Sequence, residues 1–219
     1  MKYLPSGTQR YLVYLKMKDG QKKNLWLWER TTAEETVQGK TRIGIRQNWI
    51  SSDTGYNKRE LYSTVNKESF APVYHYAYNN KTGKNAYIFT KDAVVTDDTV
   101  AAVGQPGFRQ EMNLPAFNWE LDLETFALLP LAEGKAFVIP FYHPGGKTPP
   151  KYYKYIVMGS EKIAGPDGQA IDCFLLYTEY ENNQGRSTWW ISKKNHEVLK
   201  MEELYGPIKR YKIKLAAAE

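Results

Sequence analysis

The feature that most constrains this fold is an alternation of apolar and polar side chains with a period of two. The alternation is clear in residues 11–18 and again in residues 41–50, where Ile43, Ile45 and Trp49 fall on one side. This period places successive side chains on opposite faces of a strand, whereas an amphipathic helix repeats about every 3.6 residues. The chain is therefore expected to consist mainly of half-buried β-strands.

Runs of this kind recur along the chain and are separated by turn signals such as Asp19-Gly20. The expected strands are residues 11–18, 25–29, 41–50, 59–65, 73–78, 86–90, 93–96, 135–142, 152–158, 161–163, 170–180, 187–192, 198–203 and 207–215. In the last of them the apolar side chains are expected to face the core and the basic ones to face water. The residues expected to face the core are Tyr211, Ile213 and Leu215. The residues expected to face water are Arg210, Lys212 and Lys214.

One segment departs from the alternation. Within residues 116–129, Trp119, Leu123 and Phe126 recur at helical spacing, and Pro130 follows directly. This pattern predicts one amphipathic helix or two short ones. Because helices and strands do not alternate as in a βαβ protein, the fold class is predicted to be mainly β. The expected architecture is a single antiparallel curved sheet, or half-open β-barrel, wrapped around one central helix.

Length and composition favour one domain. The chain has 219 residues, of which 42% are hydrophobic and 25% are charged, as is ordinary for globular proteins. This composition excludes disorder, collagen and coiled coil, and no Pro/Gly/Ser-rich linker divides the chain. We expect residues 1–219 to form a single β-barrel-like domain with an ordered core over about residues 10–215.

Charge and targeting signals limit the partners. Thirty Lys and Arg against 24 Asp and Glu give a formal net charge of +6. The basic residues are scattered and form no block of five or more, so no nucleic-acid partner is expected. No apolar run reaches the ~18 residues of a membrane helix, and the N-terminus lacks the apolar region of a signal peptide. The chain is expected to be either cytosolic or an exported protein without its signal segment.

The residues that most often carry catalysis or bind metals form no recognisable motif. His75, His143 and His196 lack the close spacing of metal ligands, and the single cysteine, Cys173, lies in an apolar run. We expect Cys173 to be buried and unreactive. We predict that the chain is not an enzyme, with no catalytic residue, no metal and no cofactor. Any role of the three histidines is left open.

Three acidic residues alternate at the expected start of the helix: Glu120, Asp122 and Glu124. A spacing of two on a helix points side chains apart. General acid-base catalysis by carboxylates needs two of them facing each other across a cleft. We therefore expect these carboxylates to complement the positive end of the helix dipole.

Aromatic residues make up 14% of the chain, including 17 Tyr and 6 Trp. In a small barrel, aromatic side chains can fill the interior, or they can line a cavity for an acyl chain or a sugar ring. The sequence leaves both open. The ligand-binding residues predicted for such a cavity are Trp26, Trp28, Trp49, Tyr74, Tyr76, Tyr78, Trp119 and Trp190.

Several segments resemble a known bacterial family. Residues 153–163 and 168–174, the run Ser187-Thr188-Trp189-Trp190-Ile191-Ser192-Lys193-Lys194, and residues 198–202 are similar to the family called domain of unknown function 3108. Residues 61–73 are similar to its N-terminal hairpin, with Asn66 and Ser69 in place of the family's Asp and Thr. The resemblance covers about residues 10–215.

This resemblance implies a half-open antiparallel β-barrel around a helix, similar to the lipoprotein carriers LolA and LolB. It also implies a bacterial envelope protein, exported to the periplasm or associated with the outer membrane, and the family has no established catalytic residues. We therefore expect a non-catalytic protein that binds a lipid, an acylated molecule or another hydrophobic ligand. An envelope protein is a second candidate partner.

Two alternatives remain from other functional classes. The first is a carbohydrate-binding or carbohydrate-processing protein, in which tryptophans stack on sugar rings and carboxylates such as Glu120 or Asp122 act. The second is a structural subunit that docks through an exposed strand edge.

Overall fold

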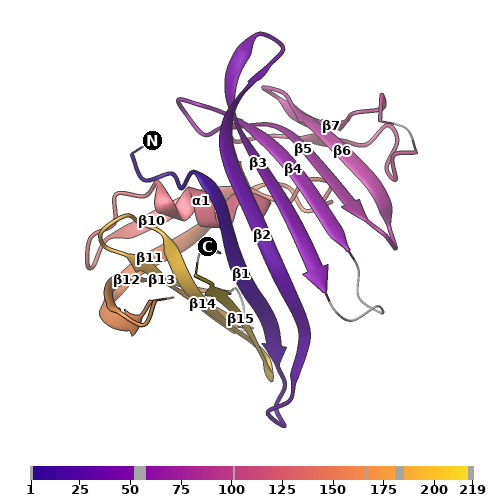
Figure 1. Ribbon diagram of the computed structural model, residues 1–219. Helices are drawn as coiled ribbons and strands as arrows, with labels where there is room; N and C mark the ends of the chain where they lie inside the picture. The colour runs from indigo at the N-terminus through magenta and orange to yellow at the C-terminus, as the bar shows by residue number, and fades with distance from the viewer. Residues whose placement is uncertain (1, 52–57, 101, 166, 181–184, 217–219) are drawn as a thin grey trace.

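The computed structural model describes residues 2–51, 58–100, 102–165, 167–180 and 185–216. In these segments fifteen strands form one sheet (Figure 1). They are β1 (Gly7–Lys16), β2 (Lys22–Val37), β3 (Lys40–Ser51), β4 (Arg59–Asn66), β5 (Pro72–Asn79), β6 (Gly83–Phe89), β7 (Ala93–Thr96), β8 (Arg109–Glu111), β9 (Phe117–Asn118), β10 (Ala136–Tyr142), β11 (Lys151–Ala164), β12 (Ala170–Glu179), β13 (Gly185–Ser192), β14 (Val198–Tyr205) and β15 (Ile208–Lys214).

The strand order describes a long meander, β8-β7-β6-β5-β4-β3-β2-β1-β15-β14-β13-β12-β11-β10-β9. The first and last strands pair with each other in antiparallel register from Tyr11↔Lys214 to Lys16↔Lys209. The two edges of the sheet, β8 and β9, are therefore consecutive in the sequence. The sheet does not close between them, so the predicted class, mainly β with one curved and open sheet, is confirmed.

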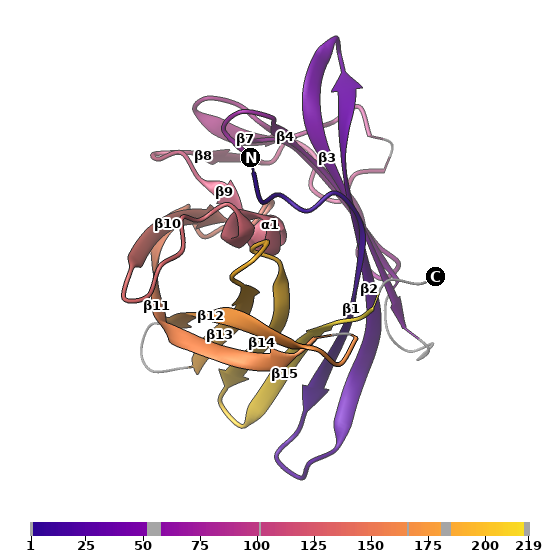
Figure 2. The same cartoon turned by 60° about the vertical axis from the view of Figure 1, so that its left-hand side comes forward.

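The helical segment lies on the concave side of this sheet, inside the curl of β10–β15 (Figure 2). It consists of a 3₁₀ turn, Trp119–Leu121, and the helix α1 (Asp122–Ala127). This segment is shorter than predicted, because residues 117 and 118 pair with β10 instead. The Asn118 side chain accepts a hydrogen bond from the Glu120 backbone N–H at 2.9 Å, which caps the first turn.

Other boundaries also differ from the prediction. The strand expected at residues 25–29 is much longer, because β2 runs from Lys22 to Val37. Residues 152–158 and 161–163 belong to one strand, β11, because a bulge shifts the register between Val157 and Ser160 without ending the ladder. The short strand β8 was not predicted, since its three residues, Arg109–Glu111, are all polar and show no alternation.

The core lies between the concave face and the helical segment. Leu123 and Phe126 of α1 pack into the main cluster, whose buried aromatic members from the sheet are Tyr11, Trp28, Phe141, Tyr155 and Trp189. Leu121 packs into a second cluster with Ile43, Ile45, Val65 and Phe70. The helical segment thus supplies apolar side chains to both halves of the sheet, and side chains fill the space beneath it.

The prediction for the last strand, β15, was wrong about which side chains face the core. The two faces of the strand are exchanged. Lys212 is buried, and its Nζ lies 3.1 Å from Oδ2 of Asp122. Tyr211 lies on the outer face, stacked on Tyr14 with 5.0 Å between ring centroids. The alternation was read correctly but assigned to the wrong faces, because a partner on α1 stabilises a lysine on the concave side.

Candidate functional site

Ion pairs hold the helical segment against the sheet. They join each acidic residue to a basic residue of a different strand: Glu120 to Arg59 of β4 at 2.6 Å, Asp122 to Lys212 of β15 at 3.1 Å, and Glu124 to Arg30 of β2. The carboxylates therefore do not simply complement the helix end, as the sequence suggested. They orient the helical segment across strands that are far apart in the sequence.

Two of these pairs shift the pKa of a member, Glu120 in one and Arg30 in the other. Burial alone would raise the pKa of Glu120, but the Arg59 guanidinium holds it below its ordinary value. Burial likewise opposes the charge on Arg30, yet Glu124 outweighs it and raises the pKa of the guanidinium. The arrangement is that of an anchored helix.

A serine and a histidine lie together behind this segment. Ser63 Oγ is 2.8 Å from Nδ1 of His75, and the Asn118 amide donates to the same nitrogen at 3.2 Å. Burial lowers the pKa of His75 to about 4, so the ring is neutral and Nδ1 accepts both bonds. Serine and histidine at this distance suit nucleophilic catalysis. Here, however, Ser63 is only 1% exposed, and the group instead joins β9 to β4 and β5.

The remaining histidines pack against aromatic rings, and the cysteine is buried in the sheet. His143 stacks on Trp119 with 4.8 Å between ring centroids, and His196 stacks on Tyr3 at 3.9 Å. Cys173 is buried in β12, as expected, and burial raises the pKa of its thiol to about 11. In the described part of the chain, no three His, Cys, Asp or Glu side chains lie close enough to hold a metal ion.

The predicted ligand-binding aromatic residues do not meet in one cavity. The concave side, in or against the main core cluster, holds Trp26, Trp28, Trp49 and Trp119. The outer face holds Tyr74, Tyr76 and Tyr78, which alternate with the buried His75, and Trp190, which packs with Cys173 and Leu199. On the concave side the rings pack on one another, with 4.7 Å between the centroids of Trp28 and Trp49.

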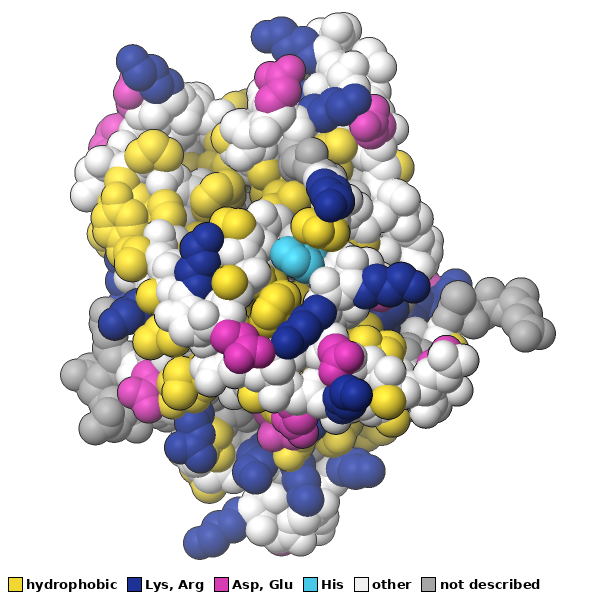
Figure 3. Space-filling view, turned by 90° about the vertical axis from the view of Figure 1, so that its left-hand side faces the viewer, with side chains coloured by type: hydrophobic (Ala, Val, Ile, Leu, Met, Phe, Trp, Pro, Cys, Tyr) yellow, Lys and Arg dark blue, Asp and Glu magenta, His cyan; other side chains and the backbone are white. Residues whose placement is uncertain are grey.

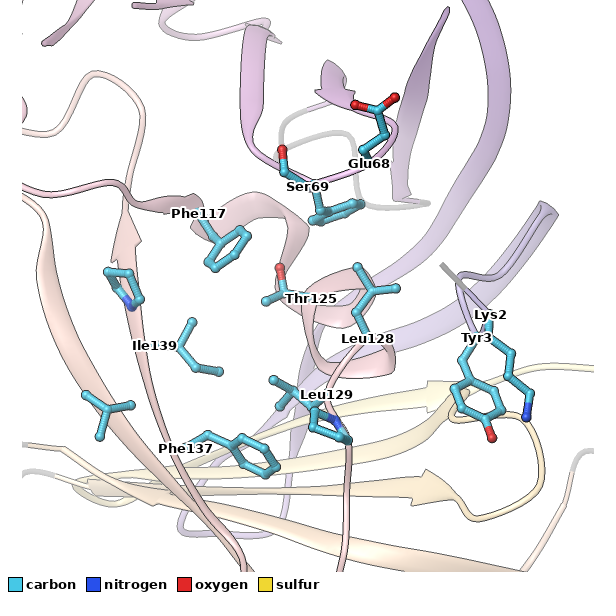
Figure 4. Close-up of a pocket in the computed structure, with 14 residues that line it drawn as sticks. Lys2, Tyr3, Glu68, Ser69, Phe117, Thr125, Leu128, Leu129, Phe137 and Ile139 are labelled. Atoms are coloured by element: carbon cyan, nitrogen blue, oxygen red, sulfur yellow. The ribbon is translucent and has the colours of Figure 1, made fainter. Parts of the chain in front are cut away.

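An open apolar pocket lies instead where the sheet fails to close. Its volume is about 560 Å³, within the roughly 300–1,000 Å³ of small-molecule sites. The walls come from β10, the end of α1, the β4–β5 turn and the N-terminal segment (Figure 4). The apolar side chains that form most of the lining include Phe117, Leu128, Leu129, Phe137, Ile139 and Pro140. We call this site the apolar pocket.

The apolar pocket follows from the pairing of β10. On one edge, β10 pairs with β11 from Ala136 to Phe141. On the other edge, β9 reaches only Phe141 and Tyr142. Within the described segments, residues 136–140 therefore have no strand on that edge, which suits Pro140 because proline lacks the N–H of a ladder bond. Val138 on this edge is 61% exposed.

The surface around this edge is hollowed. Seen from the side of β10, hydrophobic side chains gather in and beside a hollow, with Lys and Arg side chains around it (Figure 3). This site was not predicted from the sequence. The available signal was residues 136–142, a strand with apolar side chains on both faces and an internal proline, which together indicate an exposed edge.

Comparison with known proteins places these observations in a family. Residues 10–214 match the family model described as "Protein of unknown function (DUF3108)". No curated protein matches the chain. No helix in the described ranges is long and apolar enough to cross a membrane.

Three solved structures are similar to the chain at low identity. A Bacteroides fragilis protein, provisionally described as exported and with a YmcC-like fold, is 12% identical with a TM-score of 0.33, over 98% of this chain and 97% of that one. A DUF1329 family protein from Desulfovibrio piger is 10% identical with a TM-score of 0.20, over 94% and 82%. A domain from Vibrio parahaemolyticus, provisionally described as an outer membrane lipoprotein-sorting protein, is 9% identical with a TM-score of 0.24, over 95% and 83%.

Proposed function

The chain belongs to the DUF3108 family of proteins of unknown function, and we propose that it binds a hydrophobic ligand, a lipid or another acylated molecule, in the apolar pocket. The observation that carries this proposal is the apolar lining beside an unpaired strand edge. Phe137 and Ile139 of β10, together with Leu128 and Leu129 just after α1, line a space of about 560 Å³. Side chains of this kind recognise a ligand by removing its apolar surface from water.

The energetics favour a ligand that is long and flexible. Burial of an acyl chain contributes roughly 0.8 kcal/mol per methylene, whereas association costs about 4–15 kcal/mol. About ten buried methylenes would therefore offset the lower part of this cost. The margin of the pocket is polar at Lys2, Glu68 and Ser69, which suits the head group of an amphiphile.

We propose the bacterial envelope as the location, with the protein exported, because lipid and acylated ligands are concentrated there and the family resemblance implies it. Fractionation of cells that produce the natural protein tests this part separately. Recovery in the periplasmic or outer-membrane fraction supports it, and recovery in the cytosol refutes it.

Native mass spectrometry of the protein purified from cells tests the binding proposal. We expect a bound mass of lipid size that is lost after extraction with organic solvent and restored by adding a long-chain fatty acid. The variant Val138→Glu should lose this adduct, since it puts a charge on the pocket wall.

Met158→Glu is the matched control. Met158 lies on β11 outside the apolar pocket and is 63% exposed, against 61% for Val138. It should keep the adduct. A wild-type protein that carries no adduct and takes up no fatty acid would refute the proposal.

A further inference from the structure

A second cavity, of about 620 Å³, opens at the other end of the helical segment. Trp119 and Asp122 line it there, whereas Thr125 and Leu128 line the apolar pocket. Its other walls come mainly from β11, β12, β13, β14 and β15. We propose that this cavity, here called the polar pocket, is a binding site for a neutral carbohydrate. This proposal is independent of lipid binding.

Aromatic rings supply the walls of the polar pocket. Tyr152 and Tyr205 are 60% and 54% exposed. The Trp119 ring is held in place by His143 stacked on one side and by Tyr153 set edge-on, with 4.2 Å between the ring centroids of Trp119 and Tyr153. Tyrosine and tryptophan combine an apolar face with a polar group. A sugar ring has the matching combination of apolar C–H faces and hydroxyl groups.

A residue that lines the polar pocket carries a buried donor with no acceptor among the described residues. Trp189 lines the pocket and is 5% exposed, and its indole N–H makes no hydrogen bond within the described residues. Neighbouring side chains hold the ring, with 4.9 Å between its centroid and that of Phe126. A buried donor left unpaired is destabilising. A ligand hydroxyl oxygen satisfies this N–H once a small shift of the pocket wall on binding exposes it, because the nitrogen is out of reach of solvent in the unliganded protein.

The charges around the polar pocket favour a neutral ligand over an anion or a cation. The acidic side chains are Asp122, Glu179 and Glu203, and the basic ones are Lys151, Lys154 and Arg210. Two of the carboxylates are already paired, Asp122 with Lys212 and Glu203 with Arg210. Their oxygens remain acceptors for hydroxyl groups. A ligand rich in hydroxyl groups, without net charge, matches this set best.

A glycan array of neutral and anionic oligosaccharides, probed with the full chain, tests the proposal. We expect neutral oligosaccharides to bind, and isothermal titration of the strongest one to give its dissociation constant. Trp189→Phe removes the indole N–H but keeps an aromatic ring, and should weaken binding by about three- to tenfold, as expected for one hydrogen bond.

The neighbouring residue provides the control. Trp190 lies on the same strand but on the outer face, so Trp190→Phe should leave the dissociation constant unchanged. Tyr152→Ala, at an exposed position, should also weaken binding without affecting folding. Binding of anionic glycans only, or of none, would overturn the proposal, as would equal losses in Trp189→Phe and Trp190→Phe. Val138→Glu in the apolar pocket should leave sugar binding intact, which separates this proposal from lipid binding.

Discussion

Arg30 and Glu124 form a buried ion pair between β2 and α1, across 94 residues of sequence. Their side chains are 1% and 2% exposed, and Arg30 Nε donates to Oε1 of Glu124 at 3.0 Å. Arg30 also donates to the Glu120 carbonyl oxygen at 3.1 Å, and its guanidinium lies 4.6 Å from the Trp28 ring centroid. This pair is the most buried link between the helical segment and the sheet.

Removal of one partner should be strongly destabilising. Glu124→Gln leaves the Arg30 charge buried without its counterion, which we expect to lower the free energy of unfolding by about 3–5 kcal/mol. Urea denaturation followed by tryptophan fluorescence measures this. The double variant Arg30→Met/Glu124→Leu should be less destabilised than Glu124→Gln. A single variant within 0.5 kcal/mol of wild type would contradict the role assigned to the pair.

A substitution of Lys212 tests whether this residue of β15 faces the concave side of the sheet. Lys212→Met keeps the aliphatic stem but leaves Asp122 unpaired in a buried site, so we expect a loss of about 3 kcal/mol in the free energy of unfolding. Lys209→Met, at an exposed position of the same strand, should change it by less than about 0.5 kcal/mol. Equal effects would show that Lys212 faces water after all.

His75 should make stability fall with acidification. The unfolded chain binds a proton near the ordinary pKa of 6.5, whereas the folded ring resists protonation to about 4. Its contribution is therefore complete above pH 6.5 and is lost as the pH falls toward 4, by about 3 kcal/mol in total. The free energy of unfolding should fall between pH 7 and pH 4.5 in both proteins. The fall should be about 2 kcal/mol smaller in His75→Gln than in wild type. An unchanged difference would refute this.

Alanine substitutions at two glycines with positive φ distinguish the cost of backbone strain from the cost of steric overlap. Gly83 has φ +78° and open space around it, so Gly83→Ala should cost about 1–2 kcal/mol from strain alone. Gly145 has φ +79°, but a Cβ there would overlap the Tyr87 hydroxyl, which hydrogen-bonds Gln105 at 2.6 Å. We expect Gly145→Ala to be more destabilising in thermal denaturation. Equal melting temperatures would contradict the packing of Tyr87.

Most strands of the sheet could be predicted from the sequence, because local alternation determines which residues share a face. Ile43 and Ile45 were expected on one face of their strand, and both are buried against Leu121. Alternation does not identify which face becomes concave when the other face also carries large side chains. Lys212 shows this, because its partner Asp122 lies 90 residues away in the sequence.

The candidate site was harder to predict than the fold. A row of aromatic residues such as Tyr74 and Tyr76 indicates a strand but does not indicate on which side of the sheet the ligand lies. The apolar pocket depends on where β10 loses its partner, and this is set by the short parallel contact of β9 with Phe141 and Tyr142. Two-residue strands leave no periodic signal in the sequence.

Photolabelling with a diazirine-bearing palmitic acid, followed by peptide mapping, tests hydrophobic-ligand binding most directly. We expect saturable adducts on residues 128–130 and 137–140, which line the apolar pocket, and we expect unlabelled palmitate to compete with them. These adducts should be lost in Val138→Glu but not in Met158→Glu. Adducts confined to other surfaces, or labelling that does not saturate, would contradict hydrophobic-ligand binding in the apolar pocket.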